Sequence, residues 1–506
     1  MRTAPFHDLP KLYRSGAVRA AEQVAMVRFG LDQDDLMARA GLAAWRLLLD
    51  RWPQAQRLGI VCGPGNNGGD GYVLAELARS SGRHVQVMRL GDTVKAGAAK
   101  RAADAYLQAG GAVATFIAEE DLPQADVWVD ALFGIGLQRA LEGAAADIAM
   151  ALNHQTSPLL ALDVPSGVDA DTGHHHGLAV RADVTLSFIA GKPGLYTGRG
   201  RVAAGEVVID TLGLAAHVFD DLEPAARLAR PQALPLWLTP RARGAHKGDF
   251  GTVLCIGGDH GYGGAIALCA EAAHRTGAGL VSAATRAGHV PVILARRPEC
   301  MARAVDDTDA LRPLLDSATV VAVGPGLGNS AWSASMLDTA IDMTLDAGKP
   351  LVIDADALNA LACRDPRALG AAVLTPHPGE AARLLGSTVA EVEHNRIASA
   401  CQLAARYECA VVLKGAGTVV TAPGESPVII DAGNPGMATG GMGDVLTGVI
   451  AAVIAQGHSC FDAAICGALL HAAAGDAAAR DGGERGLLPS DLFVPLRRLA
   501  NPLVCA

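Results

Sequence analysis

A glycine-rich stretch beside an acid is where the residue types of this chain first indicate chemistry. Residues 431–448 read DAGNPGMATGGMGDVLTG and hold six glycines, and Asp444 directly precedes an apolar run that predicts a buried helix. Glycine lets a backbone approach a ligand closely, and a helix N-terminus presents unpaired N–H groups and a positive dipole end that favour a phosphate. Asp444 would there accept a proton from a hydroxyl that attacks phosphorus. The alternative is an acid that merely starts a helix.

A second glycine loop lies between a predicted strand and a predicted helix. Residues 63–69 read GPGNNGG, which contains the GxGxxG pattern of dinucleotide-binding turns, and Asp92 stands about where a ribose-binding acid would lie. The loop departs from that pattern because Asn66, Asn67 and Asp70 are polar. Such side chains favour a cation, a sugar hydroxyl or a carboxamide as an additional guest.

Three further polar side chains follow neighbouring strands and should meet this loop in space. Asp130, Asp163 and Ser166 stand at the ends of predicted strands, and in a parallel sheet those ends share one edge. Asn67, Asp130 and Ser166 are oxygen donors, which suits a hard cation. Asp163 is then the candidate proton carrier. The alternative is that the two acids are helix caps or loop anchors.

The second half of the chain repeats this arrangement with other residues. DADALN at 354–359 ends a buried strand with acids and an amide, which suits a magnesium ion held partly through water, or else a helix cap. His377 stands between two prolines at a strand end and favours substrate contact. Lys414, in LKGAGT, is suited to a nucleotide phosphate, although the spacing is not that of a P-loop.

These motifs sit on two series of strands that alternate with helices. Each series predicts a doubly wound parallel sheet, and the class is α/β with two domains. The alternation fails in a proline-rich stretch, so the expected layout is residues 1–220, a linker at 221–243 and residues 244–506. Residues 17–52 predict helices broken near Gly30 and Gly41.

Composition narrows the function classes. The 506 residues carry a net charge of -10 without a basic cluster, so nucleic acid is not an expected partner. Ten cysteines without a CxxC pair indicate a reducing compartment. No apolar run has the length of a membrane span, and the start lacks the plan of a signal peptide, so a cytoplasmic protein without membrane contact is expected.

The first half resembles the NAD(P)H-hydrate epimerase domain, which has a Rossmann-like, three-layer fold. The resemblance rests on LMARAG, GPGNNGGDGYVLA, DALFGIGLQR, LDVPSGVDADTG, ADVTLSF and GKPGLYTG. It implies interconversion of the R and S forms of hydrated NAD(P)H, a potassium ion on Asn67, Asp130 and Ser166, and Asp163 as acid or base. The implied substrate-binding residues are Asn66, Asn67, Gly68, Gly69, Asp70, Gly134, Ile135, Gly136, Leu137, Gln138, Arg139, Ala140 and Asp163.

The second half resembles the ADP/ATP-dependent NAD(P)H-hydrate dehydratases of the ribokinase-like fold. The carrying motifs are HKGDFG, GGDHGYGGA, GPGLG, DADALN, LTPHPGE, LKGAGT and NPGMATGGMGDVLTG. The resemblance implies phosphorylation and elimination of the ring hydroxyl with magnesium and ADP, and a homo-oligomer. The implied nucleotide-binding residues are Lys414, Gly415, Ala416, Gly417, Thr418 and Gly443, and the implied substrate-binding residues are Ala265, Gly328, His377 and Asp444.

Three other functions are compatible with parts of this pattern. A ribokinase-like kinase of a small hydroxylated metabolite would give a stable phosphorylated product. A non-catalytic nucleotide sensor would use both sites without needing Asp163 and Asp444. A redox dehydrogenase would account for GPGNNGG and leave the second half unexplained.

Overall fold

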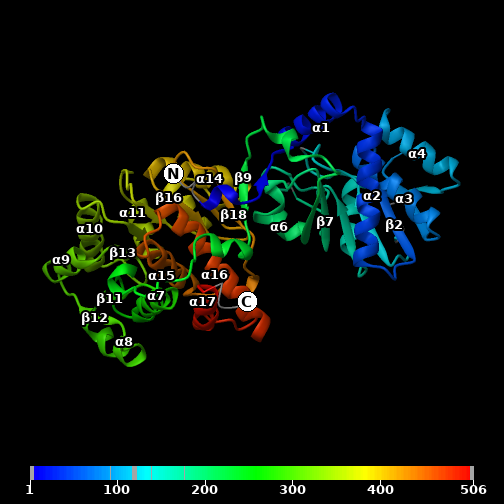
Figure 1. Cartoon of the computed structure of the whole chain (residues 1–506). Coiled ribbons are helices and arrows are strands. Elements are labelled where there is room, and N and C mark those ends of the chain that lie inside the picture. The colour runs from blue at the N-terminus through cyan, green and yellow to red at the C-terminus, as the bar shows by residue number, and fades with distance from the viewer. Residues whose placement is uncertain (1–4, 92, 117–121, 138, 176, 502–506) are drawn as a thin grey trace. The chain divides into compact units, whose positions relative to one another are not determined.

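The computed structural model describes residues 5–91, 93–116, 122–137, 139–175 and 177–501, which fold into two compact units. The smaller unit is Lys11–Ala226, and the larger combines the residues up to Pro10 with those from Arg227 onward. Figure 1 traces both units in the colours of the chain. β1 (Lys11–Leu12) marks the point where the chain first passes from one unit to the other.

The boundary between the units differs from the expected linker at 221–243. The chain there forms β9 (Ala226–Ala229), which pairs in parallel with β18 (Val428–Ile430), followed by η4 (Pro231–Leu236) and the buried Trp237. The proline-rich composition therefore belongs to a packed strand and a short 3-10 helix. Phe6 also joins the larger unit, where its ring meets that of Phe461 at 5.0 Å between centroids.

The smaller unit is built on an all-parallel sheet with the order β4-β3-β2-β5-β6-β7-β8. Its strands are β2 (Arg57–Cys62), β3 (His84–Arg89), β4 (Val113–Thr115), β5 (Val127–Ala131), β6 (Leu159–Leu162), β7 (Val184–Phe188) and β8 (Glu206–Asp210). Its helices are α1 (Ser15–Phe29), α2 (Gln33–Arg51), α3 (Asn66–Ser80), α4 (Ala98–Gln108), α5 (Ala144–Asn153) and α6 (Gly198–Ala204), with 3-10 turns η2 (Pro193–Leu195) and η3 (Ala216–Phe219).

Helices cover both faces of this sheet because successive strand residues point to opposite sides. Ile60 and Cys62 of β2 pack with α2 and α3, whereas Val61 packs with α5. The strand order reverses between β2 and β5, and ligands of doubly wound sheets bind at such a point. Residues 63–69 follow β2 directly, and Asp130 is the penultimate residue of β5.

Two local expectations for this unit were wrong. Asn66 to Asp70 are not loop residues but form the first turn and a half of α3. Gly41 does not break a helix and lies inside α2, where a Cβ would meet the side chain of Val73 at 2.4 Å. The glycine therefore permits the close packing of α2 on α3.

The larger unit is built on a mixed sheet that runs, from β9 onward, in the order β9-β18-β17-β16-β15-β14-β13-β10-β11-β12. Its further strands are β10 (Thr252–Ile256), β11 (Leu280–Thr285), β12 (Met301–Ala304), β13 (Val320–Val323), β14 (Leu351–Ile353), β15 (Ala372–Leu374), β16 (Ala410–Leu413) and β17 (Val419–Thr421). The strands from β12 to β16 are parallel, and β17 runs antiparallel to β16 and β18.

The helices of this unit lie along the sheet as Figure 1 shows. They are α7 (Gly263–Thr276), α8 (Val290–Arg296), α9 (Thr308–Ser317), α10 (Ala331–Asp346), α11 (Ala355–Ala362), α12 (Pro378–Leu385), α13 (Val389–His394), α14 (Arg396–Tyr407), α15 (Met442–Ala455), α16 (Cys460–Gly482) and α17 (Phe493–Leu499). Short 3-10 turns are η1 (Pro5–Asp8), η5 (Lys247–Phe250), η6 (Ala287–His289), η7 (Pro435–Met437) and η8 (Pro489–Leu492).

α15 lies in the centre of the larger unit and explains the apolar run after Asp444. Nearly every residue of α15 from Val445 to Ile454 is buried, against α7 on one side and α16 on the other. An all-round hydrophobic helix is expected in such a place. Its first turn, with Gly443 and Asp444, reaches the carboxyl edge of the sheet, where the loops with candidate site residues also lie.

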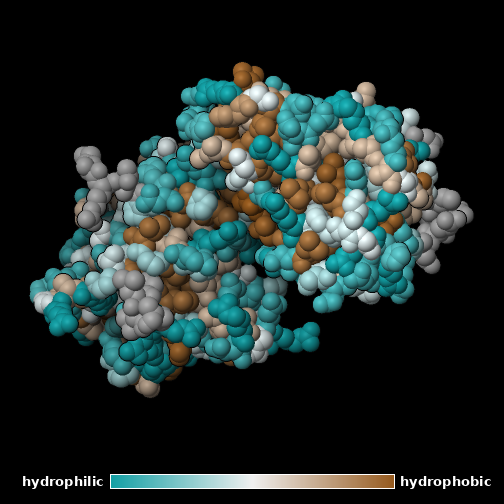
Figure 2. All heavy atoms as spheres, turned by 45° about the vertical axis from the view of Figure 1, so that its right-hand side comes forward, coloured by the Kyte–Doolittle hydropathy of each residue, from teal (hydrophilic) through white to brown (hydrophobic). Residues whose placement is uncertain are grey.

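The surface of the protein is mostly hydrophilic on the face that Figure 2 shows, with hydrophobic residues gathered in separate areas. Among the described residues, no helix combines the length and the apolar character needed to cross a membrane.

The tight contact of α15 with α7 gives a stability prediction. A Cβ on Gly448 would lie 2.1 Å from the carbonyl oxygen of Cys269, so the backbones must separate in Gly448→Ala. Overpacking of this kind costs about 1–3 kcal/mol, which lowers the melting temperature of the larger unit by about 2–10 °C. Thermal unfolding followed by circular dichroism measures this shift.

Gly482→Ala is the matched control, because Gly482 is also helical and a Cβ there would meet nothing within 4 Å. Its melting temperature should stay the same or rise slightly. Equal melting temperatures for the two variants would contradict the packing role of Gly448.

Candidate active sites

Asp163 is held in place by a buried lysine at the carboxyl edge of the smaller sheet. Its Oδ1 accepts a hydrogen bond from Lys192 Nζ at 2.5 Å, and its Oδ2 accepts one from the Ile135 N–H at 3.1 Å. Lys192 has no exposed surface and also donates to Ser187 Oγ at 3.0 Å and to the Phe188 carbonyl at 2.8 Å. Asp163 has a positive φ of 65°, a strained conformation that this network stabilises.

A cavity of about 980 Å³ opens beside Asp163 and contains two further acids. Glu22 comes from α1 and Asp70 from α3. Burial, and then the Asp163 charge, raises the pKa of Glu22, and the same causes raise the pKa of Asp70 well above its usual range. The cavity thus brings together one lysine-bound carboxylate and two carboxyl groups that favour their protonated forms. Such a contrast is typical of acid–base sites.

Of the side chains predicted to hold a cation, Asn67 lines this cavity, whereas Asp130 and Ser166 are not part of its lining. Asp130 is fully buried, and its carboxylate accepts hydrogen bonds from the Ser166 hydroxyl at 2.7 Å and from the Ser166 and Leu132 N–H groups. Burial raises the pKa of Asp130 to about 6, and no described residue forms an ion pair with it. Neither polar atom of the buried Asn67 amide has a partner.

These three residues fit a monovalent cation. The Asn67 oxygen lacks a partner, the Asp130 charge lacks a counterion among the described residues, and the Ser166 oxygen completes a donor set made of oxygen only. A potassium ion would supply there the positive charge that the buried carboxylate requires.

Most, but not all, of the residues expected to bind the first substrate line the cavity. The lining includes Asn66, Asn67, Asp70, Gly134, Ile135, Gly136, Leu137, Arg139 and Asp163. Gly68 and Gly69 are not part of the lining. A Cβ on Gly68 would lie 2.0 Å from the Gly63 carbonyl oxygen, and a Cβ on Gly69 would lie 2.5 Å from the Met37 side chain. These two glycines serve packing. Ala140 is also outside the lining, and Gln138 and Asp92 lie outside the described residues.

A second lysine–carboxylate pair organises the site of the larger unit. Asp354, which follows β14, accepts a hydrogen bond from Lys414 Nζ at 2.7 Å and one from Thr447 Oγ1 of α15 at 2.8 Å. Burial alone would raise the pKa of Asp354, but the Lys414 charge and the hydrogen bonds from Lys414, Thr375 and Thr447 together outweigh this, and the net pKa is lowered. A Cβ on Gly443 would lie 3.2 Å from Asp354 Oδ2, so glycine lets the start of α15 approach the pair.

Asp444 stands beside this pair without a partner of its own. No described residue donates a hydrogen bond to its carboxylate or forms an ion pair with it, and it lies in the first turn of α15, next to that helix's N–H groups. Burial, and then the Asp354 charge, raises the pKa of Asp444 to about 7, although Lys414 acts in the opposite direction. A carboxyl group with this pKa can exchange a proton near neutral pH.

His377 caps α12 and faces the same lysine. Its Nδ1 accepts hydrogen bonds from the N–H groups of Gly379 at 3.0 Å and Glu380 at 3.3 Å, so its other ring nitrogen carries the proton. Burial and then Lys414 lower the pKa of His377. Glu380 Oε2 lies 3.9 Å from Lys414 Nζ, and burial raises the pKa of Glu380 to about 7. About half of the His377 side chain remains exposed for a ligand.

Gly328 is bound to Asp356, and Ala265 lies next to the same glycine-rich loop. The Gly328 N–H donates to Asp356 Oδ2 at 2.8 Å, and its positive φ of 72° requires a glycine-like conformation. A Cβ on the neighbouring Gly326 would lie 3.0 Å from that of Ala265. The loops after β10, β13, β14, β15 and β16 thus bring the expected substrate-binding residues to one edge of the sheet.

In the loop expected to bind the nucleotide, Lys414 to Thr418, the lysine pairs with a carboxylate of the protein. The Lys414 ammonium is bound to Asp354, so the loop offers mainly backbone groups to a ligand. Gly415 and Gly417 have positive φ values of 140° and 64°, and the Thr418 hydroxyl donates to the Gly415 carbonyl at 3.2 Å. Ala416 is exposed at the tip between them.

The DADALN residues do not form a magnesium site by themselves. Asp354 is bound to Lys414 and Thr447, Asp356 accepts from Gly328, and Asn359 Oδ1 accepts from Arg383 at 3.0 Å. Among the described residues no group of three His, Cys, Asp or Glu side chains is placed to hold a metal ion. Magnesium here would depend on the phosphate groups of a bound nucleotide.

Comparisons with known proteins agree with this division into two sites. A family model described as YjeF-related protein N-terminus matches residues 33–194, and one described as NAD(P)H-hydrate dehydratase matches residues 253–498. The bifunctional NAD(P)H-hydrate repair enzyme Nnr of Coxiella burnetii (strain RSA 493 / Nine Mile phase I) is 46% identical over 97% of this chain and 99% of its own length. The chain belongs to the family of bifunctional NAD(P)H-hydrate repair enzymes.

Further relatives support the same family and fold. The repair enzyme Nnr of Escherichia coli (strain K12) is 43% identical over 96% of this chain and 93% of its own length. The solved structure of a ribokinase-like superfamily protein from Enterococcus faecalis V583 is 30% identical, with a TM-score of 0.50, and covers 55% of this chain and 95% of its own. The expected α/β class, with a Rossmann-like and a ribokinase-like doubly wound domain, is confirmed.

Several residues that shape the two sites of this repair enzyme were not found by sequence reasoning. Lys192 lies in GKPGLYTG and Thr447 in DVLTG, where no pattern indicates a carboxylate partner. Asp476 of α16 accepts hydrogen bonds from the Gly433 N–H at 2.8 Å and the Asn434 amide at 2.9 Å, which fixes the glycine-rich stretch. Sequence reasoning missed Asp476 because it lies 43 residues after Gly433 and 42 residues after Asn434.

The Lys192–Asp163 pair gives a stability prediction. Lys192→Met leaves a buried carboxylate without its cation, which costs about 3–5 kcal/mol and lowers the melting temperature of the smaller unit by about 6–20 °C. Combining Lys192→Met with Asp163→Asn removes the unpaired charge and should restore at least half of the loss. Differential scanning calorimetry measures both.

Lys100→Met serves as the control, because Lys100 is half exposed and pairs with Asp104 on the surface of α4. It should change the melting temperature little. A double variant as unstable as Lys192→Met alone would rule out the charge pair as the cause.

Proposed function

We propose that the smaller unit interconverts the R and S forms of hydrated NAD(P)H and that the larger unit converts the S form to NAD(P)H at the expense of ADP. The observation that carries the proposal is Asp444, a carboxyl group without a partner among the described residues, at the N-terminus of α15 beside the Asp354–Lys414 pair. A phosphoryl-transfer site needs a base, N–H groups for the phosphate and a fixed positive charge, and this place offers all three.

In the larger unit the substrate's ring hydroxyl is a poor leaving group until it is phosphorylated. Asp444 takes the hydroxyl proton while the oxygen attacks the terminal phosphorus of ADP, and AMP leaves. The N–H groups at the start of α15 stabilise the charge on the transferred phosphate. Elimination of phosphate, with loss of a proton from the adjacent ring carbon, then restores the reduced nicotinamide ring. Ala265, Gly328, His377 and Asp444 would face the hydrate.

The adenine nucleotide would lie against the loop from Lys414 to Thr418 and the backbone of Gly443. The two positive-φ glycines of that loop orient its backbone, and Lys414, held in place by Asp354, would supply an ammonium group close to the phosphates. ADP in preference to ATP is part of the proposal.

In the smaller unit Asp163 would act as the acid or base of epimerisation. Lys192 and the Ile135 N–H fix its carboxylate at the cavity wall. Asn66, Asn67, Asp70 and the segment from Gly134 to Arg139 would bind the hydrate. A potassium ion on Asn67, Asp130 and Ser166 would supply positive charge next to an anionic substrate.

Cellular location and assembly complete the proposal. The nine cysteines of the described chain are all free, which supports a reducing compartment such as the cytoplasm. We propose a homo-oligomer, as the family resemblance implies.

Recovery of NADH from its hydrate tests the function, together with one variant per site. The wild-type protein, given both epimers, ADP and magnesium, should convert nearly all of the hydrate, as absorbance of reduced nicotinamide shows. Asp444→Asn should abolish recovery and leave epimerisation intact. Asp163→Asn should stop recovery near half, because only the S form is consumed. Chromatography of the epimers follows the first reaction separately.

Two outcomes would contradict the proposal. If either variant, folded as judged by its circular dichroism spectrum, disabled both reactions equally, the division into two sites would be wrong. If the wild-type protein recovered no NADH but phosphorylated another small alcohol to a stable product, the kinase alternative would hold.

The pKa of Asp444 gives a pH prediction for the dehydration step. A base must be deprotonated, so kcat/KM of dehydration should rise with pH through about 7 and level off above it. Rates measured with the S form alone from acidic to alkaline pH check this.

Glu380 is the control, because its pKa is raised to about 7 as well. Glu380→Gln should lower the rate without removing the rise near pH 7. Loss of the rise in Glu380→Gln would assign the titration to Glu380 and exclude Asp444 as the base.

A further inference from the structure

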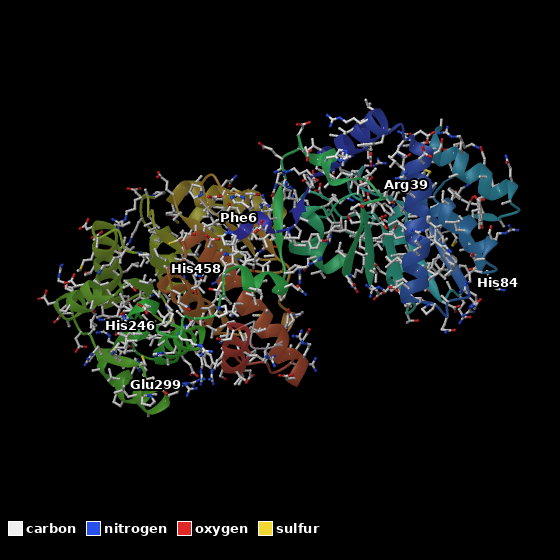
Figure 3. All side chains as sticks on the ribbon, viewed as in Figure 1. Phe6, Arg39, His84, His246, Glu299 and His458 are labelled. Atoms are coloured by element: carbon white, nitrogen blue, oxygen red, sulfur yellow. The ribbon has the colours of Figure 1, made fainter. Side chains whose placement is uncertain are left out.

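A second cavity lies in the larger unit, at the edge of the sheet opposite the candidate active site. It has a volume of about 560 Å³ and is lined by the segment 237–242, by Asp249 and Phe250, by the end of α7 and by the end of α17. Asp249 and Phe250 directly precede β10, and Gly277 precedes β11, so the cavity is at the amino ends of these parallel strands. Asp444 and the nucleotide loop belong to the carboxyl ends. Figure 3 labels two of the lining residues, Glu299 and His458.

Arginines outnumber the acids that are free to pair with them in this cavity. Arg241, Arg275, Arg297 and Arg497 line it. The acid Glu271 has no exposed surface and already pairs with Arg275 at 3.7 Å, with Arg296 at 3.3 Å and with Arg297.

The other lining acids do not balance this excess. Asp249 accepts a hydrogen bond from the His246 N–H at 2.8 Å and lies 3.5 Å from its ring, and Glu299 is exposed. Arg497 forms no ion pair with any described residue. The cavity therefore keeps a positive charge that the described chain does not neutralise.

Of the four arginines that line the cavity, only Arg241 binds the carbonyl end of a described helix. The carbonyl end of α7 carries partial negative charge, and Arg241 donates to the Gly277 carbonyl there. Arg241 also donates to the side-chain Oε1 of Gln456, the residue that follows α15. Arg241 also lies 3.5 Å above the ring of Phe250, which fixes its plane. Arg497 and Arg275 have no such carbonyl partner among the described hydrogen bonds.

Buried polar atoms on the wall also lack partners. Among the described residues, the hydroxyl of Thr276, which is 3% exposed, has no hydrogen-bond partner, and neither have His274 Nε2 and Arg297 Nε. Each residue lines the cavity. The other ring nitrogen of His274 donates to the Glu299 backbone, so of these three residues only Thr276 and Arg297 present unpaired donors. A buried donor without an acceptor costs about 1–3 kcal/mol, so these two on one concave wall point to a ligand that accepts hydrogen bonds.

We infer that this cavity binds the oxyanion group, phosphate or carboxylate, of a small metabolite at a site separate from the reaction. Arginine forks match both groups with paired N–H donors, and the volume accommodates a molecule of metabolite size. The Thr276 hydroxyl provides a neutral hydrogen bond. The inference does not rest on the repair reaction, because it uses none of its residues.

Calorimetric titration of the full-length protein tests this inference. Pyrophosphate and citrate are titrated separately, with ADP present to occupy the nucleotide site and without magnesium. We expect one anion to bind per chain, and the arm that binds more tightly identifies the group. Arg497→Gln should weaken binding roughly 10- to 100-fold, the loss of a charged hydrogen bond, and Thr276→Val should weaken it several-fold.

Arg303→Gln is the matched control, because Arg303 is an exposed arginine on β12 outside the cavity. Its affinity should equal that of the wild-type protein. Absence of binding by both anions at millimolar concentration would overturn the inference. Equal weakening by Arg303→Gln and Arg497→Gln would also overturn it, since the effect would then be one of net charge.

Discussion

The Asp354–Lys414 ion pair is the contact on which the larger site depends. It joins the ends of β14 and β16 across β15, and Thr447 ties the same carboxylate to α15. Two charges buried together are stable only when both are paired and hydrogen-bonded, so the pair fixes three elements at once. It also sets the electrostatics of its surroundings: the Asp354 charge helps to raise the pKa of Asp444, and Lys414 lowers that of His377.

The smaller unit also contains a buried lysine–carboxylate pair at the carboxyl edge of its sheet. Lys192, brought in by the segment after β7, binds Asp163 after β6, and nearby Glu22 and Asp70 have raised pKa values. In each unit a lysine binds one carboxylate, and the charge of that carboxylate helps to raise the pKa of its acidic neighbours. A proton donor and a proton acceptor can then exist side by side at neutral pH.

The sequence predicts which residues reach the site better than it predicts what they contact. Acids and glycines at strand ends must share one edge of a parallel sheet, so Asp130, Asp163 and Asp354 could be placed from the alternation of strands and helices. Their partners could not, because Lys192 and Lys414 lie 29 and 60 residues further along the chain. The sequence also does not show whether a glycine serves a site or only packing. Gly443 approaches an ion pair, whereas Gly68 only lets two backbone segments come into contact.

The opposite edges of the larger sheet illustrate how far charge alone can indicate function. At the carboxyl edge each buried charge has a partner, and the unpaired group is an acid at a helix N-terminus. At the amino edge arginines exceed the acids available to them, and the Thr276 hydroxyl and Arg297 Nε have no acceptor among the described residues. Folding does not require either imbalance, because an uncompensated buried group lowers stability. Each imbalance is therefore better explained by a molecule that the protein binds than by the needs of its own core.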